Sequence, residues 1–142
     1  TLSTTEMKRC MMIWSTKISR WKNRSNKFEL DKNDVTILGF SQGGSICWKL
    51  GLDFRKRFRR IIPLSSFIHP SYLNEDLNYY KDLDIYSSHG TLDEVIPISL
   101  VENYIESLTR KNNLVFDKFE AGHTISQENL INLIKWIDMT NL

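Results

Sequence analysis

Short apolar runs alternate with amphipathic segments along most of this 142-residue chain. Four of the runs are typical of β-strands because they are brief and rich in β-branched residues, and they cover residues 35–40, 60–65, 85–88 and 114–119. Apolar residues at three- and four-residue spacing predict helices over residues 3–22, 42–52, 70–79, 97–112 and from 124 onward. Strands joined mainly through helices indicate an α/β protein with a parallel sheet of about four strands, flanked by helices.

The same pattern predicts which side chains face the core. The stripe of the helix over residues 97–112 consists of Val101, Tyr104, Ile105 and Leu108, and that of the last helix of Leu130, Leu133, Ile134 and Ile137. Thr124 and Gln127 form a capping box at the start of the last helix. The strand over residues 35–40 is continuously apolar, which predicts that it is covered on both faces. Pro63 lacks a ladder donor, so we expect it near a strand end or at a bulge.

The composition excludes several classes of protein. Hydrophobic residues make up 41% and charged residues 25% of the chain, as in soluble globular proteins, and the length favours one domain over residues 1–142. No apolar run approaches the roughly 20 residues that span a bilayer, and residues 1–25 lack the apolar region of a signal peptide. We therefore expect no stable membrane insertion.

Charge and cysteine content point to neither nucleic acid nor metal. A net charge of +2 is too small to indicate a nucleic-acid partner, and the basic run Arg55–Arg60 is interpreted as a solvated loop between a helix and a strand. The two cysteines, Cys10 and Cys47, each fall within a predicted helix and lack metal-type spacing. We expect both to be free thiols in a reducing compartment.

The candidate chemistry begins at the end of the first predicted strand. Gly39-Phe40-Ser41-Gln42-Gly43 is a Gly-x-Ser-x-Gly pattern between a strand and a helix, which is the arrangement of a nucleophile elbow. On such a sharp turn the backbone of Ser41 is strained and its hydroxyl projects above the sheet. Gly39 and Gly43 are expected where a Cβ would collide as strand and helix pass closely, and Gly43 and Gly44 are expected to let the start of the helix approach the sheet. The bare pattern is weak evidence, and its context has to strengthen it.

Two further strand ends carry reactive groups. Asp93 follows the third strand and His123 follows the fourth, and the carboxyl ends of parallel strands meet at one edge of a sheet. The order Ser, Asp, His is that of the α/β-hydrolase triad. Ser41 would be the nucleophile, His123 the base that takes its proton, and Asp93 the acid that orients the imidazole. The backbone N–H of Gln42, at the start of the next helix, would bind the oxyanion.

Each assignment has competitors in the sequence. Glu94 adjoins Asp93, but we expect it to be solvated. His69 is expected at the surface, and His89 is expected to hold the loop of Asp93 through hydrogen bonds. Gly122 permits a tight turn that directs His123 toward the elbow.

Three stretches make the likeness to a family specific: Leu38-Gly39-Phe40-Ser41-Gln42-Gly43-Gly44, His89-Gly90-Thr91-Leu92-Asp93-Glu94-Val95-Ile96-Pro97 and Gly122-His123. Together they resemble the signature stretches of the phospholipase/carboxylesterase family of α/β-hydrolases, which includes the acyl-protein thioesterases. Ile62-Pro63-Leu64-Ser65 is similar to the strand after the elbow helix in that family.

The resemblance implies an α/β-hydrolase fold and cofactor-free hydrolysis of carboxyl esters or acyl thioesters in the cytoplasm. The substrate would be a small or lipid-like acyl ester or thioester, or an acylated protein. It also implies that Ser41, Asp93 and His123 are catalytic, that Gln42 is an oxyanion donor, and that Phe40, Phe67 and Ile68 border the acyl pocket.

The chain departs from the family at its start. Family members have earlier strands leading into a His-Gly loop that supplies a second oxyanion donor, and no such loop precedes Ser41 here. The expected sheet is therefore the C-terminal half of the family's sheet. The strand over residues 35–40 would have an unpaired apolar edge, and one sheet face would lack a covering helix. We accordingly expect the C-terminal part of a longer hydrolase, with a non-catalytic remnant as the alternative.

Overall fold

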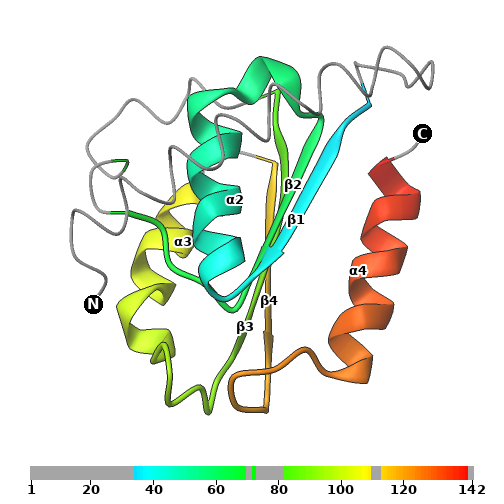
Figure 1. Cartoon of the computed structure of the whole chain (residues 1–142). Helices are drawn as coiled ribbons and strands as arrows, with labels where there is room; N and C mark the ends of the chain where they lie inside the picture. The colour runs from blue at the N-terminus through cyan, green and yellow to red at the C-terminus, as the bar shows by residue number, and fades with distance from the viewer. Residues whose placement is uncertain (1–33, 70–71, 73–81, 110–112, 141–142) are drawn as a thin grey trace. The chain divides into compact units, whose positions relative to one another are not determined.

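Four parallel strands form one sheet in the order β1-β2-β3-β4 (Figure 1). The strands are β1 Thr36–Phe40, β2 Arg60–Leu64, β3 Asp84–Gly90 and β4 Leu114–Phe119. The computed structural model describes residues 34–69, 72, 82–109 and 113–140. The helix predicted over residues 3–22, which contains Cys10, lies outside these ranges, and so does the helix predicted over residues 70–79 apart from Tyr72. Within them, all four predicted strands are confirmed, and β3 is longer than expected.

Helices connect the strands and cover both faces of the sheet. They are α2 Gln42–Asp53, α3 Glu102–Thr109 and α4 Gln127–Thr140, with short 3-10 turns at Arg55–Arg57 and Ile98–Leu100. Helices α2 and α3 lie on one face and α4 lies on the other (Figure 1). These layers are those of an α/β protein with a parallel sheet of four strands flanked by helices, as the sequence predicts.

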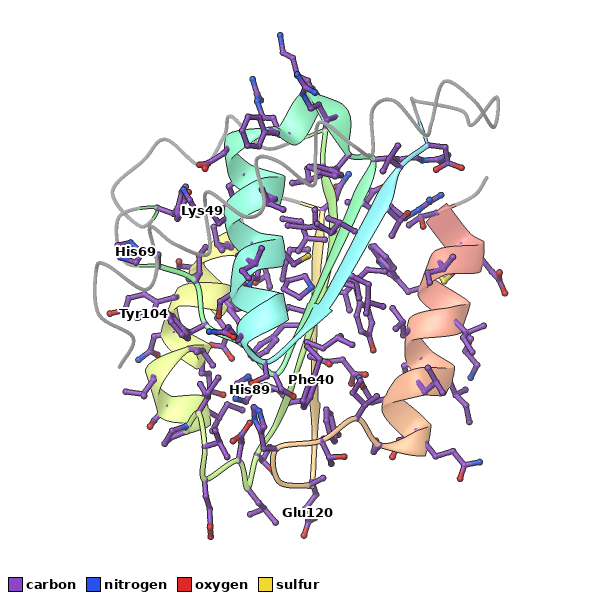
Figure 2. The ribbon with its side chains drawn as sticks, viewed as in Figure 1. Phe40, Lys49, His69, His89, Tyr104 and Glu120 are labelled. Carbon is purple, nitrogen blue, oxygen red and sulfur yellow. The ribbon has the colours of Figure 1, made fainter. Side chains whose placement is uncertain are left out.

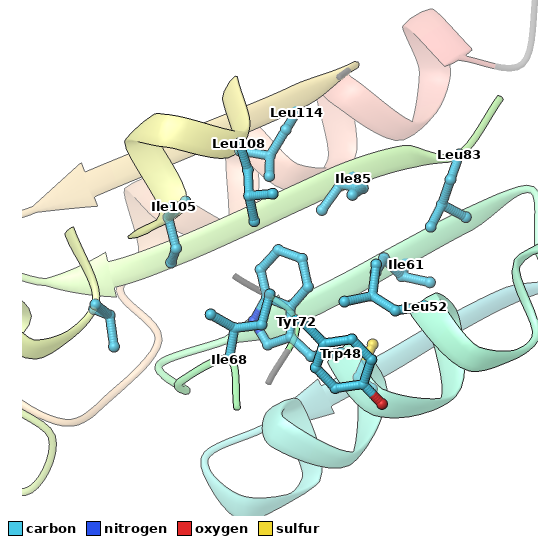
Figure 3. Close-up of a cluster of buried hydrophobic side chains, with 12 residues drawn as sticks. Trp48, Leu52, Ile61, Ile68, Tyr72, Leu83, Ile85, Ile105, Leu108 and Leu114 are labelled. Carbon is cyan, nitrogen blue, oxygen red and sulfur yellow. The ribbon is translucent and has the colours of Figure 1, made fainter. Parts of the chain in front are cut away.

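Adjacent residues of the central strands face opposite layers, as the two-residue period of a strand requires. Ile61 and Ile85 pack with Trp48, Leu52, Ile105 and Leu108 beneath α2 and α3 (Figure 3). Ile62 and Tyr86 pack with Leu133 and Trp136 beneath α4. Cys47 is a free, buried thiol in the first layer, and burial raises its pKa to about 12.

The prediction that the first strand is covered on both faces is wrong. Ile37 packs against the core beneath α2, but Leu38 is 55% exposed and Phe40 is 36% exposed. Among the described residues, α4 packs against β2, β3 and β4, and Leu38 of β1 stays exposed. The second expectation, a face without any helix, is likewise corrected because α4 occupies part of it.

The predicted stripe of the last helix is partly wrong. Leu133 is buried and Ile137 packs against the core, whereas Leu130 and Ile134 are about half exposed. The buried face instead includes Trp136 and Asn129, which is 0% exposed. Asn129 can be buried because its side chain is hydrogen-bonded to Ser88, Tyr86 and Asp117. A polar residue at a buried position is not found by a search for apolar residues at helical spacing.

Other local expectations change in detail. The cap of α4 is Ser126, whose hydroxyl accepts the Asn129 N–H at 3.0 Å, in place of the predicted Thr124 box. Tyr104 of α3 is 42% exposed and does not join the buried stripe. Pro63 is the fourth of five residues in β2, near the strand end as expected.

The basic run is only partly the solvated loop that the sequence predicts. Arg60 begins β2 and is 3% exposed. Its guanidinium donates to the Thr140 carbonyl at 3.1 Å, where the backbone oxygens of α4 lack helical partners, and to Asp34 at 2.8 Å. Arg60 therefore ties the end of α4 to the start of the sheet.

Candidate active site

Ser41 occupies a sharp turn between β1 and α2. Its φ of 56° and ψ of −121° lie in a region that non-glycine residues rarely adopt, as expected for an elbow. Its N–H donates to the Leu64 carbonyl at 2.9 Å, which anchors the turn to the end of β2. A Cβ at Gly39 would lie 2.1 Å from the Gly43 carbonyl oxygen, so strand and helix approach each other as closely as predicted.

The second glycine required by close packing is Gly44, and the expectation for Gly43 is wrong. A Cβ at Gly43 would have no atom within 4 Å. A Cβ at Gly44 would lie 2.6 Å from Ser66 Cβ and 2.8 Å from the Leu64 carbonyl oxygen. The first turn of α2 therefore rests on the end of β2 through Gly44.

The three residues proposed as a triad are joined by hydrogen bonds. His123 Nε2 lies 2.8 Å from Ser41 Oγ, and His123 Nδ1 lies 2.7 Å from Asp93 Oδ2. With the carboxylate on the Nδ1 side, the imidazole carries its proton there. Nε2 then has a free lone pair that accepts the hydroxyl of Ser41. This is the geometry needed for a base and its orienting acid.

Asp93 is held as a carboxylate by its surroundings. Burial raises its pKa, but the N–H groups of Ile96 and Val95 and the imidazole of His123 outweigh burial, so the pKa lies below its ordinary value. The two N–H groups donate to Oδ1 at 2.8 and 2.9 Å, while Oδ2 lies 2.7 Å from His123 Nδ1 and 3.4 Å from His89 Nε2. The loop after β3 thus fixes both the charge and the orientation of the carboxylate.

The competing residues lie elsewhere or have other partners. Glu94 and His69 are exposed. His89 is buried near the carboxyl end of the sheet (Figure 2), and its Nε2 donates to the Ile96 carbonyl at 2.8 Å. His89 therefore braces the loop of Asp93, in agreement with its predicted role.

Gln42 is the first residue of α2, and its side chain is exposed. The first four N–H groups of a helix lack intrahelical acceptors and lie at the positive end of the helix dipole. The Gln42 N–H follows Ser41 directly, at the position expected of an oxyanion donor.

The three residues predicted to border an acyl pocket differ in exposure. The ring of Phe40 lies 5.0 Å from the imidazole of His123, between ring centroids, and Phe40 is partly exposed. Phe67 is 43% exposed, whereas Ile68 is 3% exposed and belongs to the core beneath α2. Of these three residues, Phe40 is therefore the one whose ring contacts the imidazole of His123.

Sequence reasoning missed the groups that position the triad through the backbone. The carbonyl of Leu64 and the N–H groups of Val95 and Ile96 leave no side-chain signal. A common turn arrangement has an aspartate whose carboxylate accepts the backbone N–H groups of the residues two and three positions later. This arrangement was the available sequence signal for the surroundings of Asp93.

The described residues hold neither a metal site nor a membrane-spanning helix. They contain no cluster of three His, Cys, Asp or Glu residues placed to hold a metal ion. None of the helices in those ranges has the length and apolarity to cross a bilayer.

Comparison with known proteins identifies the family of the chain. A family model described as phospholipase/carboxylesterase matches residues 3–141, nearly the whole chain. No curated protein matches the chain.

Solved structures of esterases share the fold. Esterase PE8 superposes with a TM-score of 0.69 at 23% identity, with 84% of this chain and 56% of that chain covered. The Bacillus cereus carboxylesterase gives 0.72 at 15% identity, with the same coverage. A variant of Arabidopsis thaliana SOBER1 gives 0.72 at 21% identity, with 89% and 62% covered. The chain thus spans somewhat more than half the length of these structures.

Proposed function

Because the chain belongs to the phospholipase/carboxylesterase family, we propose that it is a serine hydrolase that cleaves carboxyl esters or acyl thioesters. The observation that carries this proposal is the unbroken hydrogen-bonded path from Asp93 through His123 to Ser41. Three residues from three separate loops meet in the geometry of a nucleophile, base and acid.

In the first half of the reaction, Ser41 Oγ attacks the carbonyl carbon of the substrate while His123 Nε2 takes the hydroxyl proton. The Asp93 carboxylate stabilises the resulting imidazolium, and the N–H of Gln42 donates to the oxyanion. When the tetrahedral intermediate collapses, the bond to the leaving group breaks. The imidazolium proton passes to the departing alcohol or thiol, and the acyl group remains on Ser41.

In the second half, water replaces the leaving group. His123 takes a proton from water as its oxygen attacks the acyl carbon, and the same oxyanion site stabilises the second intermediate. Collapse returns the proton to Ser41 and releases the carboxylic acid. No cofactor takes part in either half.

The acyl group would lie beside Phe40, which adjoins His123 and is partly exposed. Phe67, also exposed, comes from the loop after β2 and would contact the same substrate. Apolar side chains of this kind suit an acyl chain, either of a small ester or of a lipid-like thioester.

A second candidate function is that of a non-catalytic module that retains the hydrolase fold. The observation that favours it is that this chain covers only 56–62% of the three solved structures, and the family's second oxyanion donor would lie in the remainder. Loss of one oxyanion donor typically lowers turnover by about 10²- to 10³-fold.

Labelling with a fluorophosphonate distinguishes the two functions. We expect Ser41 to be the labelled residue in the folded 142-residue chain, and a Ser41→Ala variant to stay unlabelled. The same pair is tested on p-nitrophenyl esters of increasing chain length and on an acyl thioester. Absence of label from protein whose circular dichroism and cooperative unfolding are intact would favour the non-catalytic module.

A further inference from the structure

The end of β2 contacts all three segments that carry the proposed triad. The Leu64 carbonyl accepts the N–H of Ser41, and the N–H of the next residue, Ser65, donates to the Ser88 carbonyl on β3 at 2.8 Å. The hydroxyl of Ser65 donates to the Thr124 carbonyl at 3.3 Å, next to His123. One dipeptide therefore links the nucleophile turn, the strand that leads to Asp93, and the loop of His123.

Ser65 is also held in an unfavourable backbone conformation. Its φ is 43°, and it shares a positive φ with Ser41 alone among the non-glycine residues that the structure describes. The side chain is 0% exposed. A strained and fully buried residue persists where several contacts determine its position, and such residues cluster at active sites.

On the side before His123, the loop is held by the Leu92 N–H, which donates to the Ala121 carbonyl at 3.0 Å. On the side after His123, it is held by the hydroxyl of Ser65. The Thr124 N–H donates to the Gly122 carbonyl at 2.9 Å, which closes a tight turn around His123. That bond is internal to the turn and does not fix the turn relative to the sheet. The hydroxyl of Ser65 does so, because it joins the turn to the end of a central strand.

We propose that Ser65 is a positioning residue of the active site, which holds the His123 turn so that Nε2 stays within hydrogen-bonding distance of Ser41 Oγ. This proposal rests on the proposed function. Ser65 is buried and acts on the substrate only through His123. It therefore affects the rate of the chemical step and not the binding of the acyl group.

Ser87 provides a matched control for the loss of the hydroxyl. It is 1% exposed, lies on β3, and donates its hydroxyl to the Pro63 carbonyl at 3.1 Å. Ser65→Ala and Ser87→Ala thus remove the same group from the same kind of buried bond. Ser65→Gly removes the hydroxyl while relieving the strained φ, which keeps the test open if Ser65→Ala folds poorly.

The first readout is the fluorophosphonate labelling rate and the separate kcat and KM for a p-nitrophenyl ester. We expect Ser65→Ala and Ser65→Gly to lower the labelling rate and kcat about tenfold, the effect of one hydrogen bond, with KM unchanged. Ser87→Ala should label at the wild-type rate. Wild-type rates in Ser65→Gly, or an equal loss in Ser87→Ala, would overturn the proposal.

The second readout does not depend on catalysis. Amide hydrogen exchange, followed by mass spectrometry, should be at least threefold faster across residues 121–126 in Ser65→Gly than in wild type or Ser87→Ala. Unchanged exchange would overturn the positioning role even if the enzyme is active. If wild-type protein shows no labelling of Ser41 while exchange does respond, the proposed function fails and the role of Ser65 in holding the turn stands.

Discussion

At the scale of single residues, the proposed acid is selected by its surroundings and not by its type. Asp93 and Glu94 are adjacent carboxylates, but only Asp93 is buried, and it receives two backbone N–H groups and His123. These donors lower the pKa of Asp93 despite its burial. The carboxylate therefore stays ionised at a more acid pH than a free aspartate, whose pKa is about 3.9.

This charge state predicts the shape of the pH profile. The fluorophosphonate labelling rate should fall on the acid side, because a protonated His123 cannot accept the proton of Ser41. Since the lowered pKa keeps Asp93 ionised, this carboxylate adds no second proton to the transition. The logarithm of the rate should therefore fall with a slope of one down to about pH 4.

Two results would contradict this prediction. A profile that stays flat over the whole pH range in which the protein is folded would remove His123 as the base. A slope that steepens to two above pH 4 would show that Asp93 is protonated within the same range. Circular dichroism at each pH serves as the control, because only points from folded protein count.

At the scale of elements, the active site depends on how closely α2 approaches the ends of the strands. Gly39 and Gly44 bring the first turn of the helix against β1 and β2, whereas Gly43 has open space around its Cα. The sequence predicts the elbow because Gly-x-Ser-x-Gly follows a strand. It does not show which glycine of the pair Gly43-Gly44 is packed, because that depends on the neighbouring strand.

The pair provides a sharp test of this packing. Gly44→Ala should lower the free energy of unfolding by about 1–3 kcal/mol, since a Cβ would press on Ser66 and on the Leu64 carbonyl. It should also slow labelling, because that carbonyl anchors Ser41. Gly43→Ala should raise the free energy of unfolding by up to about 1 kcal/mol, the gain in helix propensity. Urea unfolding measures both variants, and equal stabilities would refute the close approach at Gly44.

The last helix illustrates the limit of sequence periodicity. The apolar spacing predicts that this helix exists and that it follows β4. The buried face nevertheless differs from the predicted stripe, because Asn129 is buried and Ile134 is exposed. A pattern of apolar residues assumes that buried positions are apolar. The hydrogen bonds from Asn129 to Tyr86 and Asp117 make the polar exception favourable, and these partners lie on other strands.

At the scale of the whole molecule, the parallel sheet could be predicted but the coverage of its faces could not. Runs of apolar residues separated by helices predict a parallel sheet, and the order Ser41, Asp93, His123 predicts which ends of the strands meet. Exposure of Leu38 depends on where α4 lies relative to β1, which is a tertiary property. The strained φ of Ser65 likewise has no local signal, since serine is not a residue that positive φ favours.

The uncovered side of β1 predicts the solution behaviour of the chain. Leu38 is 55% exposed on a strand whose neighbour among the described strands is β2, and exposed apolar edges favour self-association. Leu38→Lys should therefore lower light scattering at high protein concentration, while the free energy of unfolding changes by less than about 0.5 kcal/mol. Ile37→Lys is the control, because the adjacent residue packs into the core beneath α2 and the substitution should destabilise the fold by several kcal/mol. If Leu38→Lys lowers the free energy of unfolding as strongly as Ile37→Lys, Leu38 is buried in solution, and the prediction of an exposed apolar side on β1 is wrong.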